Sequence, residues 1–113
     1  MLVRIWKTQF DAAQKQKLLD YAHHVSLPVL STREGARGVM FFSSGNQWTT
    51  MTLWDDQASI DKLDGDAEYQ QIVAGIEALG VLGDEHSVDV FDYDGGSLSM
   101  FFAGAMNRAG TDL

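Results

Sequence analysis

The alternation of side chains from Gln47 to Trp54 predicts a β-strand, because successive residues of a strand point to opposite faces. One face carries Trp48 and Trp54 with two threonines between them, and the other carries Met51 and Leu53. An antiparallel sheet with one solvated face does not usually place bulky side chains on both faces. We therefore expect one face to be covered by the protein's own helices and the other by a second subunit.

The remaining hydrophobic patterns predict a complete small domain. Strands are expected at 2–9, 39–44, 47–54 and 87–93, and helices at about 11–27, 56–63 and 66–79. Asp11 with Gln14 forms a capping box at the first helix, and Pro28 should end or bend that helix. Glu34–Gly38 and Gly83–Asp84 are expected to be loops.

This order of elements, β-α-β-β-α-β, predicts an α+β protein with the ferredoxin-like split βαβ topology. Its four-stranded antiparallel sheet would carry helices on one face only. Residues 1–95 would form this domain. Residues 96–113 would form a C-terminal tail with apolar residues at helical spacing, which we expect to be a short docking helix.

The composition narrows the classes of partner. The chain has 113 residues, a net charge of −8 at pH 7 and no cysteine. A chain with this negative charge is not expected to bind nucleic acid or an anionic membrane. Without cysteine, it has no thiol for a disulfide or a metal. No stretch has the ~18 apolar residues of a membrane span. We therefore expect a cytoplasmic protein whose partners are itself and a small-molecule ligand, with no nucleic acid and no membrane.

A set of residues in and after the central hairpin forms a recognisable pattern, namely Gly38-Val39, Thr52–Asp56, and then Ala58, Ile60 and Tyr69. This pattern resembles the antibiotic-biosynthesis-monooxygenase-like (ABM-like) domains of the dimeric α+β barrel superfamily. The resemblance covers the predicted domain and leaves the tail outside. It implies a homodimer in which two sheets pack through their open faces, with a ligand pocket between each sheet and its own helices.

The resemblance also implies an activity. Characterised members include cofactor-independent oxygenases of quinol- or anthrone-like aromatics and haem-degrading enzymes. The haem-degrading members use an Asn on the first strand and a Trp and a His on the second helix. The first strand here offers Trp6 and Lys7, and the helix positions fall near Leu63 and Val73. The resemblance therefore favours a monooxygenase of a small aromatic or enolisable compound, without a cofactor or a metal.

His23 is the candidate catalytic base for such a reaction, which begins by removing a phenol or enol proton. It borders the apolar stripe of the first helix, whereas His24 lies ~100° further around the helix and faces away. Adjacent histidines also lack the i, i+4 spacing of a helical metal site. His86 lies in the acidic run 84–89, which is more simply a solvated loop than a cation site.

Aromatic and basic side chains supply the candidate substrate-binding residues, which are Trp6, Tyr21, Arg33, Arg37, Trp48, Trp54 and Tyr69. The tryptophans and tyrosines could wall a pocket, or they could be ordinary core and interface residues. The loop arginines, Arg33 and Arg37, lie where specificity residues often occur. Together with Arg4 they could recognise a carboxylate or phenolate, and Arg4 could instead pair with an acid across a dimer.

Three functions stay open on the sequence alone. The first is a cofactor-independent oxygenase, and the second is a non-catalytic barrel that binds a small molecule or only dimerises. The third is an isomerase or cyclase with His23 as its base. They differ in whether an ionisable side chain reaches the pocket between the helices and the sheet.

Overall fold

The computed structural model describes residues 1–97. The expected docking helix of the tail lies outside these residues. The strands are β1 (Leu2–Phe10), β2 (Ala36–Ser44), β3 (Gln47–Trp54) and β4 (Leu82–Asp92). The helical segments are η1 (Ala12–Gln14), α1 (Lys15–Tyr21), η2 (Ala22–Ser26), α2 (Leu27–Ser31), α3 (Gln57–Asp61), η3 (Lys62–Gly65) and α4 (Ala67–Ala78).

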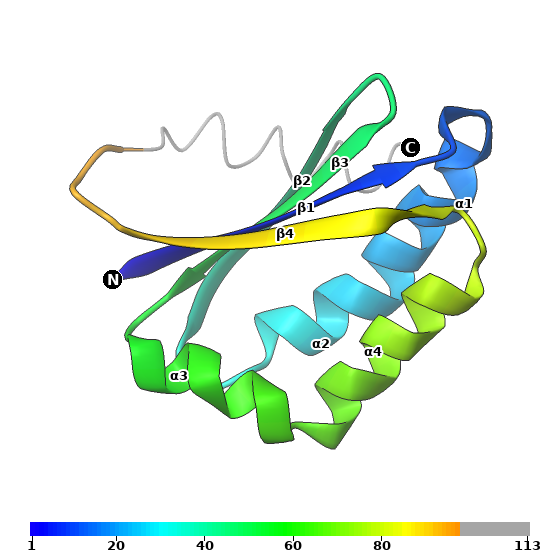
Figure 1. Cartoon of the computed structure of the whole chain (residues 1–113). Coiled ribbons are helices and arrows are strands. Elements are labelled where there is room, and N and C mark those ends of the chain that lie inside the picture. Colours follow the sequence, from blue (N-terminus) through cyan, green and yellow to red (C-terminus); the bar gives the residue numbers. More distant parts are fainter. Residues whose placement is uncertain (98–113) are drawn as a thin grey trace.

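The four strands form one sheet in the order β2-β3-β1-β4, with every neighbouring pair antiparallel. The helices lie on one side of this sheet, and the other side carries no helix among the described residues (Figure 1). The predicted α+β ferredoxin-like βαββαβ fold is therefore confirmed. None of the helices in residues 1–97 is long and apolar enough to cross a membrane.

The strand register decides which side chains meet the helices. Arg4 lies opposite Thr52, and Trp6 lies opposite Thr50 on β3 and Val88 on β4. Residues paired across strands point to the same face, so all five side chains lie on the helix side of the sheet. The same alternation puts the β3 tryptophans on the helix side and the intervening methionine and leucine on the open side.

Two tryptophans on β3 anchor two separate parts of the core. Trp48 and Trp54 are 1% and 0% exposed. Trp48 packs with Phe10, Leu18, Ala22 and Val81, whereas Trp54 packs with Ile60 and Leu63. Each indole N–H is satisfied within its own strand, because Trp48 Nε1 donates to Thr50 Oγ1 (3.1 Å) and Trp54 Nε1 donates to Thr52 Oγ1 (2.7 Å). The two small threonines therefore occupy the stretch of sheet between the two clusters.

The first helix begins as predicted and runs further than predicted. The Asp11 side chain accepts hydrogen bonds from the Ala13 backbone N–H (3.0 Å) and from the Gln14 side chain (2.9 Å). Of the two outcomes expected at Pro28, an end or a bend, the helix does not end there, because helical structure continues to Ser31. Proline usually breaks a helix by clashing with the carbonyl four residues earlier. Here the π-helical segment η2, directly before α2, widens the turn and accommodates the proline.

Two expected loops are partly strand. β2 begins at Ala36 instead of 39, with a register shift before Gly38 that leaves Arg37 outside the ladder. Gly83–Asp84 belongs to β4 and not to a loop, because β4 takes up extra residues between the pairs Thr8–His86 and Phe10–Leu82 and continues to Leu82. Bulges of this kind take up an extra residue without ending the pairing. His86 lies before this shift, opposite Thr8 in the regular ladder, so the prediction of a loop there is wrong, although the residue is exposed as expected.

We expect Thr52→Val to lower the free energy of unfolding by about 1–3 kcal/mol, because the buried Trp54 indole N–H would lose its acceptor. The substitution nearly preserves side-chain volume, so the missing oxygen should dominate the effect. Chemical denaturation followed by tryptophan fluorescence would measure it. Thr49→Val, on the same strand but accepting from no indole among the described residues, is the matched control. Equal losses in the two variants would contradict the assigned role of Thr52.

Candidate functional site

A cavity of about 190 Å³ lies between the sheet and the helices. The strands β1 and β3 form its floor, and residues of η2, α2 and α4 form the opposite wall. Its apolar lining includes Trp6, Leu30, Phe41, Trp48, Ile72 and Ile76. Its polar lining consists of Arg4, Ser26, Thr50, Thr52, Tyr69, Glu77 and His86. The site is therefore a mainly apolar hollow with a few polar groups, the usual composition of a small-molecule pocket.

The mouth of the cavity lies along the edge strand β4. Val88, which lines the cavity, is 49% exposed, whereas Trp48 on the floor is 1% exposed. Glu77 and His86 are also exposed lining residues. A ligand would therefore enter beside β4 and reach toward β3.

One end of the cavity carries a cation and a hydroxyl. Arg4 on β1 donates from Nη2 to the Tyr69 hydroxyl oxygen at 3.3 Å. Tyr69 stands in the first turn of α4, and its backbone N–H donates to the capping carboxylate of Asp66 at 3.0 Å. Capping fixes the start of a helix. The cap therefore helps to hold the Tyr69 ring in place beside Arg4.

The other end of the floor carries an imidazole. His86 Nδ1 lies 2.9 Å from Thr8 Oγ1, and the His86 ring stacks on Trp6 with centroids 5.7 Å apart. The Thr8 hydroxyl also lies 3.3 Å from the Glu85 carbonyl oxygen, to which it donates. A hydroxyl has one proton, so it accepts from the imidazole when it donates to the carbonyl. In that arrangement the imidazole carries its proton on Nδ1, which leaves Nε2 able to accept a proton.

The π-helical segment supplies part of the opposite wall. Ala22 and Ser26 are its first and last residues, both are buried, and both line the cavity together with Leu30 of α2. Isolated π-helical turns are often found at functional sites. Here the wide turn lets the helix pass Pro28 while keeping these three residues on the cavity side.

Proteins of known structure share this architecture, although no protein-family model and no curated protein matches the chain. One similar structure is a monooxygenase from the ActVA-Orf6 gene of Streptomyces coelicolor in complex with the ligand nanaomycin D. It is 15% identical with a TM-score of 0.74, and the match covers 87% of this chain and 91% of that one. A candidate antibiotic biosynthesis monooxygenase from Deinococcus radiodurans is 11% identical with a TM-score of 0.70, covering 88% and 99%. This chain has the ABM-like fold.

Other proteins with the ABM-like fold have no assigned reaction. The NE2512 protein from Nitrosomonas europaea, of unknown function, is 14% identical with a TM-score of 0.69, covering 87% of this chain and 93% of that one. One fold can host several functions, so a function is argued from the site. Among residues 1–97 there is no group of three or more His, Asp or Glu side chains placed to hold a metal ion.

Three of the eight predicted site residues line the cavity of this ABM-like fold, namely Trp6, Trp48 and Tyr69. His23 does not line it; its ring meets the edge of Phe41, with centroids 5.8 Å apart. Trp54 is fully buried in its own cluster, where its indole donates to Thr52. The structure therefore brings two tryptophans and one tyrosine to the pocket and places His23 outside the lining.

Tyr21 joins two helices instead of lining the cavity. Its hydroxyl donates to the backbone carbonyl of Ile72 on α4 at 2.6 Å. Gly75 makes this contact possible, because a Cβ there would lie 2.3 Å from the Tyr21 hydroxyl oxygen. Burial raises the pKa of Tyr21 above its ordinary value. The residue therefore holds α1 against α4.

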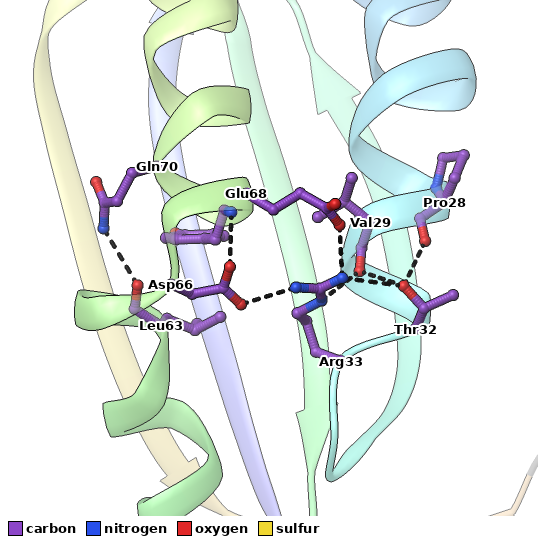
Figure 2. Close-up of polar contacts among 9 residues, drawn as sticks. Pro28, Val29, Thr32, Arg33, Leu63, Asp66, Glu68 and Gln70 are labelled. Atoms are coloured by element: carbon purple, nitrogen blue, oxygen red, sulfur yellow. Dashed lines mark hydrogen bonds and ion pairs between the residues drawn. The ribbon is translucent and has the colours of Figure 1, made fainter.

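Arg33 and Arg37 form ion pairs away from the cavity. Figure 2 shows Arg33 between the end of α2 and the start of α4, where Nη1 lies 2.9 Å from Asp66 Oδ2 and Nη2 lies 2.6 Å from Glu68 Oε1. Arg33 Nε also donates to the Val29 carbonyl oxygen at 3.1 Å. Arg37 instead pairs with the exposed carboxylate of Asp55 at 2.7 Å. Among residues 1–97, neither arginine is part of the cavity lining.

The cavity also contains polar residues outside the eight predicted site residues, above all Arg4, Glu77 and His86. Of these, only Arg4 was considered from the sequence as a group that could recognise a carboxylate or phenolate. The strand alternation contains the information for Arg4, because it shares a face with Trp6. The alternation also contains the information for His86, which shares a face with Val88 once β4 is extended. Glu77 is one helical turn from the lining residue Val73. The sequence therefore contains the information that places these residues in the cavity, but using it requires the strand register and the true start of β4.

We expect Arg33→Met to lower Tm by roughly 5 °C at pH 7, because it removes two hydrogen bonds to the start of α4 and one to the Val29 carbonyl of α2. The hydrogen bond from Arg33 is the main cause that lowers the pKa of Asp66 below 3.8, its ordinary value. A carboxylate with a lowered folded-state pKa stabilises the fold above its unfolded pKa and loses this contribution as pH falls. Thermal melts between pH 7 and pH 2.5 should therefore show the difference between Arg33→Met and wild type shrinking below pH 3.8.

Arg37→Met is the matched control for this measurement. It breaks an ion pair with an exposed carboxylate, which contributes little to stability. Its Tm at pH 7 should stay close to that of the wild type. A larger drop for Arg37→Met than for Arg33→Met would contradict the role given to the α2–α4 ion pair.

Proposed function

We propose that this protein is a cofactor-independent oxygenase that acts on a small aromatic or enolisable compound of the quinol or anthrone type. The observation that carries the proposal is the cavity between sheet and helices, which combines aromatic walls with ionisable side chains. The ABM-like fold supports it, since proteins with this fold include monooxygenases. A cytoplasmic location belongs to the same proposal.

The reaction that suits this site needs only the substrate and O2. A base removes a phenol or enol proton, and the resulting carbanion-like anion passes one electron to O2. The two radicals combine to form a C–O bond, which gives a peroxide. When the peroxide forms at an anthrone-type CH2 group, loss of water leaves a new C=O group. One oxygen atom thus stays in the carbonyl and the other leaves as water with the two hydrogens, so no further reductant is required.

The side chains of the cavity divide this work. Trp6, Trp48 and Phe41 provide flat surfaces on which an aromatic ring can pack. His86 is the proposed base, because it lines the cavity and because its Nε2 is free when the Thr8 hydroxyl donates to the Glu85 carbonyl oxygen. A positioned base of this kind contributes typically 10²–10⁴-fold to rate. His23 is the competing choice from the sequence, but it is not among the lining residues.

Oxygen uptake tests the activity directly. The protein would be mixed with hydroquinones and anthrones under air, and a Clark electrode would follow O2 consumption. We expect uptake above buffer with at least one compound, and we expect His86→Gln to reduce it roughly 100-fold or more because the base is lost. His24→Gln, which changes an exposed histidine of η2, should retain the wild-type rate.

Two results would overturn parts of this proposal. No uptake above buffer with any compound would reject the oxygenase and leave a non-catalytic small-molecule-binding or dimerisation barrel. A larger loss for His23→Gln than for His86→Gln would return the role of base to His23. The circular-dichroism spectrum of each variant would show whether it is folded.

We further propose that a second copy of this chain covers the open face of the sheet. On the described part of that face, partly exposed apolar side chains extend across all four strands: Val3, Ile5, Met40, Phe42, Met51, Leu53 and Phe91. Phe42 and Phe91 are 50% and 52% exposed. A contiguous apolar surface of this kind typically marks a protein interface. Two such faces are self-complementary, as a two-fold symmetric dimer requires.

Analytical ultracentrifugation at micromolar concentration should give the mass of a dimer. Phe42→Glu should shift it to a monomer, because a charge would be buried in the apolar interface without a partner. Val25→Glu, which changes an exposed residue on a helix, is the control and should stay dimeric. A monomeric mass for the wild-type chain would reject the proposed homodimer.

A further inference from the structure

Arg4 differs from the other arginines of the described chain. Arg33 and Arg37 both pair with carboxylates, at 2.9 Å and 2.7 Å. Arg4 has no carboxylate within 4.0 Å among residues 1–97, although it is half-buried in the cavity. The hydrogen bond from Arg4 to Tyr69 offers a hydroxyl and not a countercharge. The cavity therefore contains a cation that its own surroundings do not neutralise.

An anion in the cavity would remove this imbalance. A guanidinium group stays charged in proteins and carries five N–H donors. Tyr69 accepts from Arg4, so the proton of its own hydroxyl stays available to a ligand. Two different donors thus converge on one place at the end of an apolar hollow. Hydrogen bonds from charged donors are about twice as strong as neutral ones, and more so when water is excluded.

The acidic residue of the cavity lies at a distance from this pair. Glu77 and Tyr69 are both on α4, eight residues apart, which corresponds to about 12 Å along a helix. Glu77 is exposed at the mouth, whereas Tyr69 is half-buried. The cavity is therefore electrically polarised, with Arg4 at one end and Glu77 at the other. A ligand with one anionic end would bind with that end at Arg4.

The size of the hollow limits the body of this ligand. A cavity of about 150 Å³ holds one benzene ring, and this one measures about 190 Å³. Drug-sized ligands occupy roughly 300–1,000 Å³. Trp6, two residues from Arg4 on the same face of β1, lies where it can pack against a ring. The enclosed part of the site thus suits one or two fused rings.

We propose that the cavity binds a one- or two-ring aromatic anion whose carboxylate or phenolate oxygen is received by Arg4 and Tyr69, with its ring against Trp6. The inference rests on the proposed function in that both use the same cavity as the ligand site. It adds the charge of the ligand and limits its size, which among the proposed substrates favours quinols of one or two rings over three-ring anthrones. It also explains how the anion formed in the proposed reaction would be stabilised.

A matched pair of probes tests the charge. Isothermal titration calorimetry would compare 2-naphthoate, an anion, with 2-naphthamide, a neutral compound of nearly the same shape. We expect the wild type to bind 2-naphthoate roughly 10- to 100-fold more tightly, because a charged hydrogen bond replaces a neutral one. Arg4→Met should abolish this preference and leave the affinity for 2-naphthamide nearly unchanged. Arg37→Met, which removes a surface cation outside the cavity, should retain the preference.

Several outcomes would overturn the inference. Equal affinity of the wild type for the two probes would reject it, and so would an unchanged preference in Arg4→Met. Loss of the preference in Arg37→Met as well would show that general surface charge attracts the anion. The oxygenase proposal fails separately, because a protein that prefers the anion but consumes no O2 would keep this inference and lose that function. Oxygen uptake that is unaffected by Arg4→Met would keep the oxygenase and lose the inference that Arg4 receives the anion.

Discussion

Two buried indole N–H groups on one strand must find acceptors without water, and the rest of the site depends on how they do so. Each is satisfied by a threonine two residues away on β3, so tryptophan and threonine have to occupy the same face. Each tryptophan packs in its own apolar cluster, and the two clusters lie at opposite ends of the sheet. The threonines are too small to fill the stretch between them, and the cavity lies there. Stability of the strand and the existence of the pocket thus have one origin.

A chain of contacts connects the surface of the protein to this pocket. Arg33 holds Asp66, and Asp66 caps the helix turn that carries Tyr69. Tyr69 in turn accepts from Arg4 on the cavity floor. The loop arginine expected to recognise substrate therefore acts two contacts away from it, through the start of α4. A residue in such a position affects the geometry of a site without touching a ligand.

The sequence predicted the fold well because period-two and period-3.6 patterns report directly which face is buried. The hairpin, the Asp11 cap of the first helix and the order of elements followed from local signals. The site was predicted less well, because it depends on two irregularities. The π-helical turn changes the angular spacing of residues after Ala22, so a regular helical wheel misplaces His23. The bulge on β4 opposite Gln9 extends this strand to Leu82, and His86 pairs with Thr8 in the regular part of the ladder, where a pattern of charges had indicated a loop.

The division of the core into two clusters has a thermodynamic consequence. The described domain has an unfilled region between them, and a bound ligand would become the packing that joins them. Such a ligand binds the folded chain and not the unfolded one, so it adds RT ln(1 + [L]/Kd) to stability, about 2.7 kcal/mol at 100-fold saturation. Melting temperature thereby becomes a direct measure of occupancy. A library of compounds could be searched by thermal shift before any reaction is known.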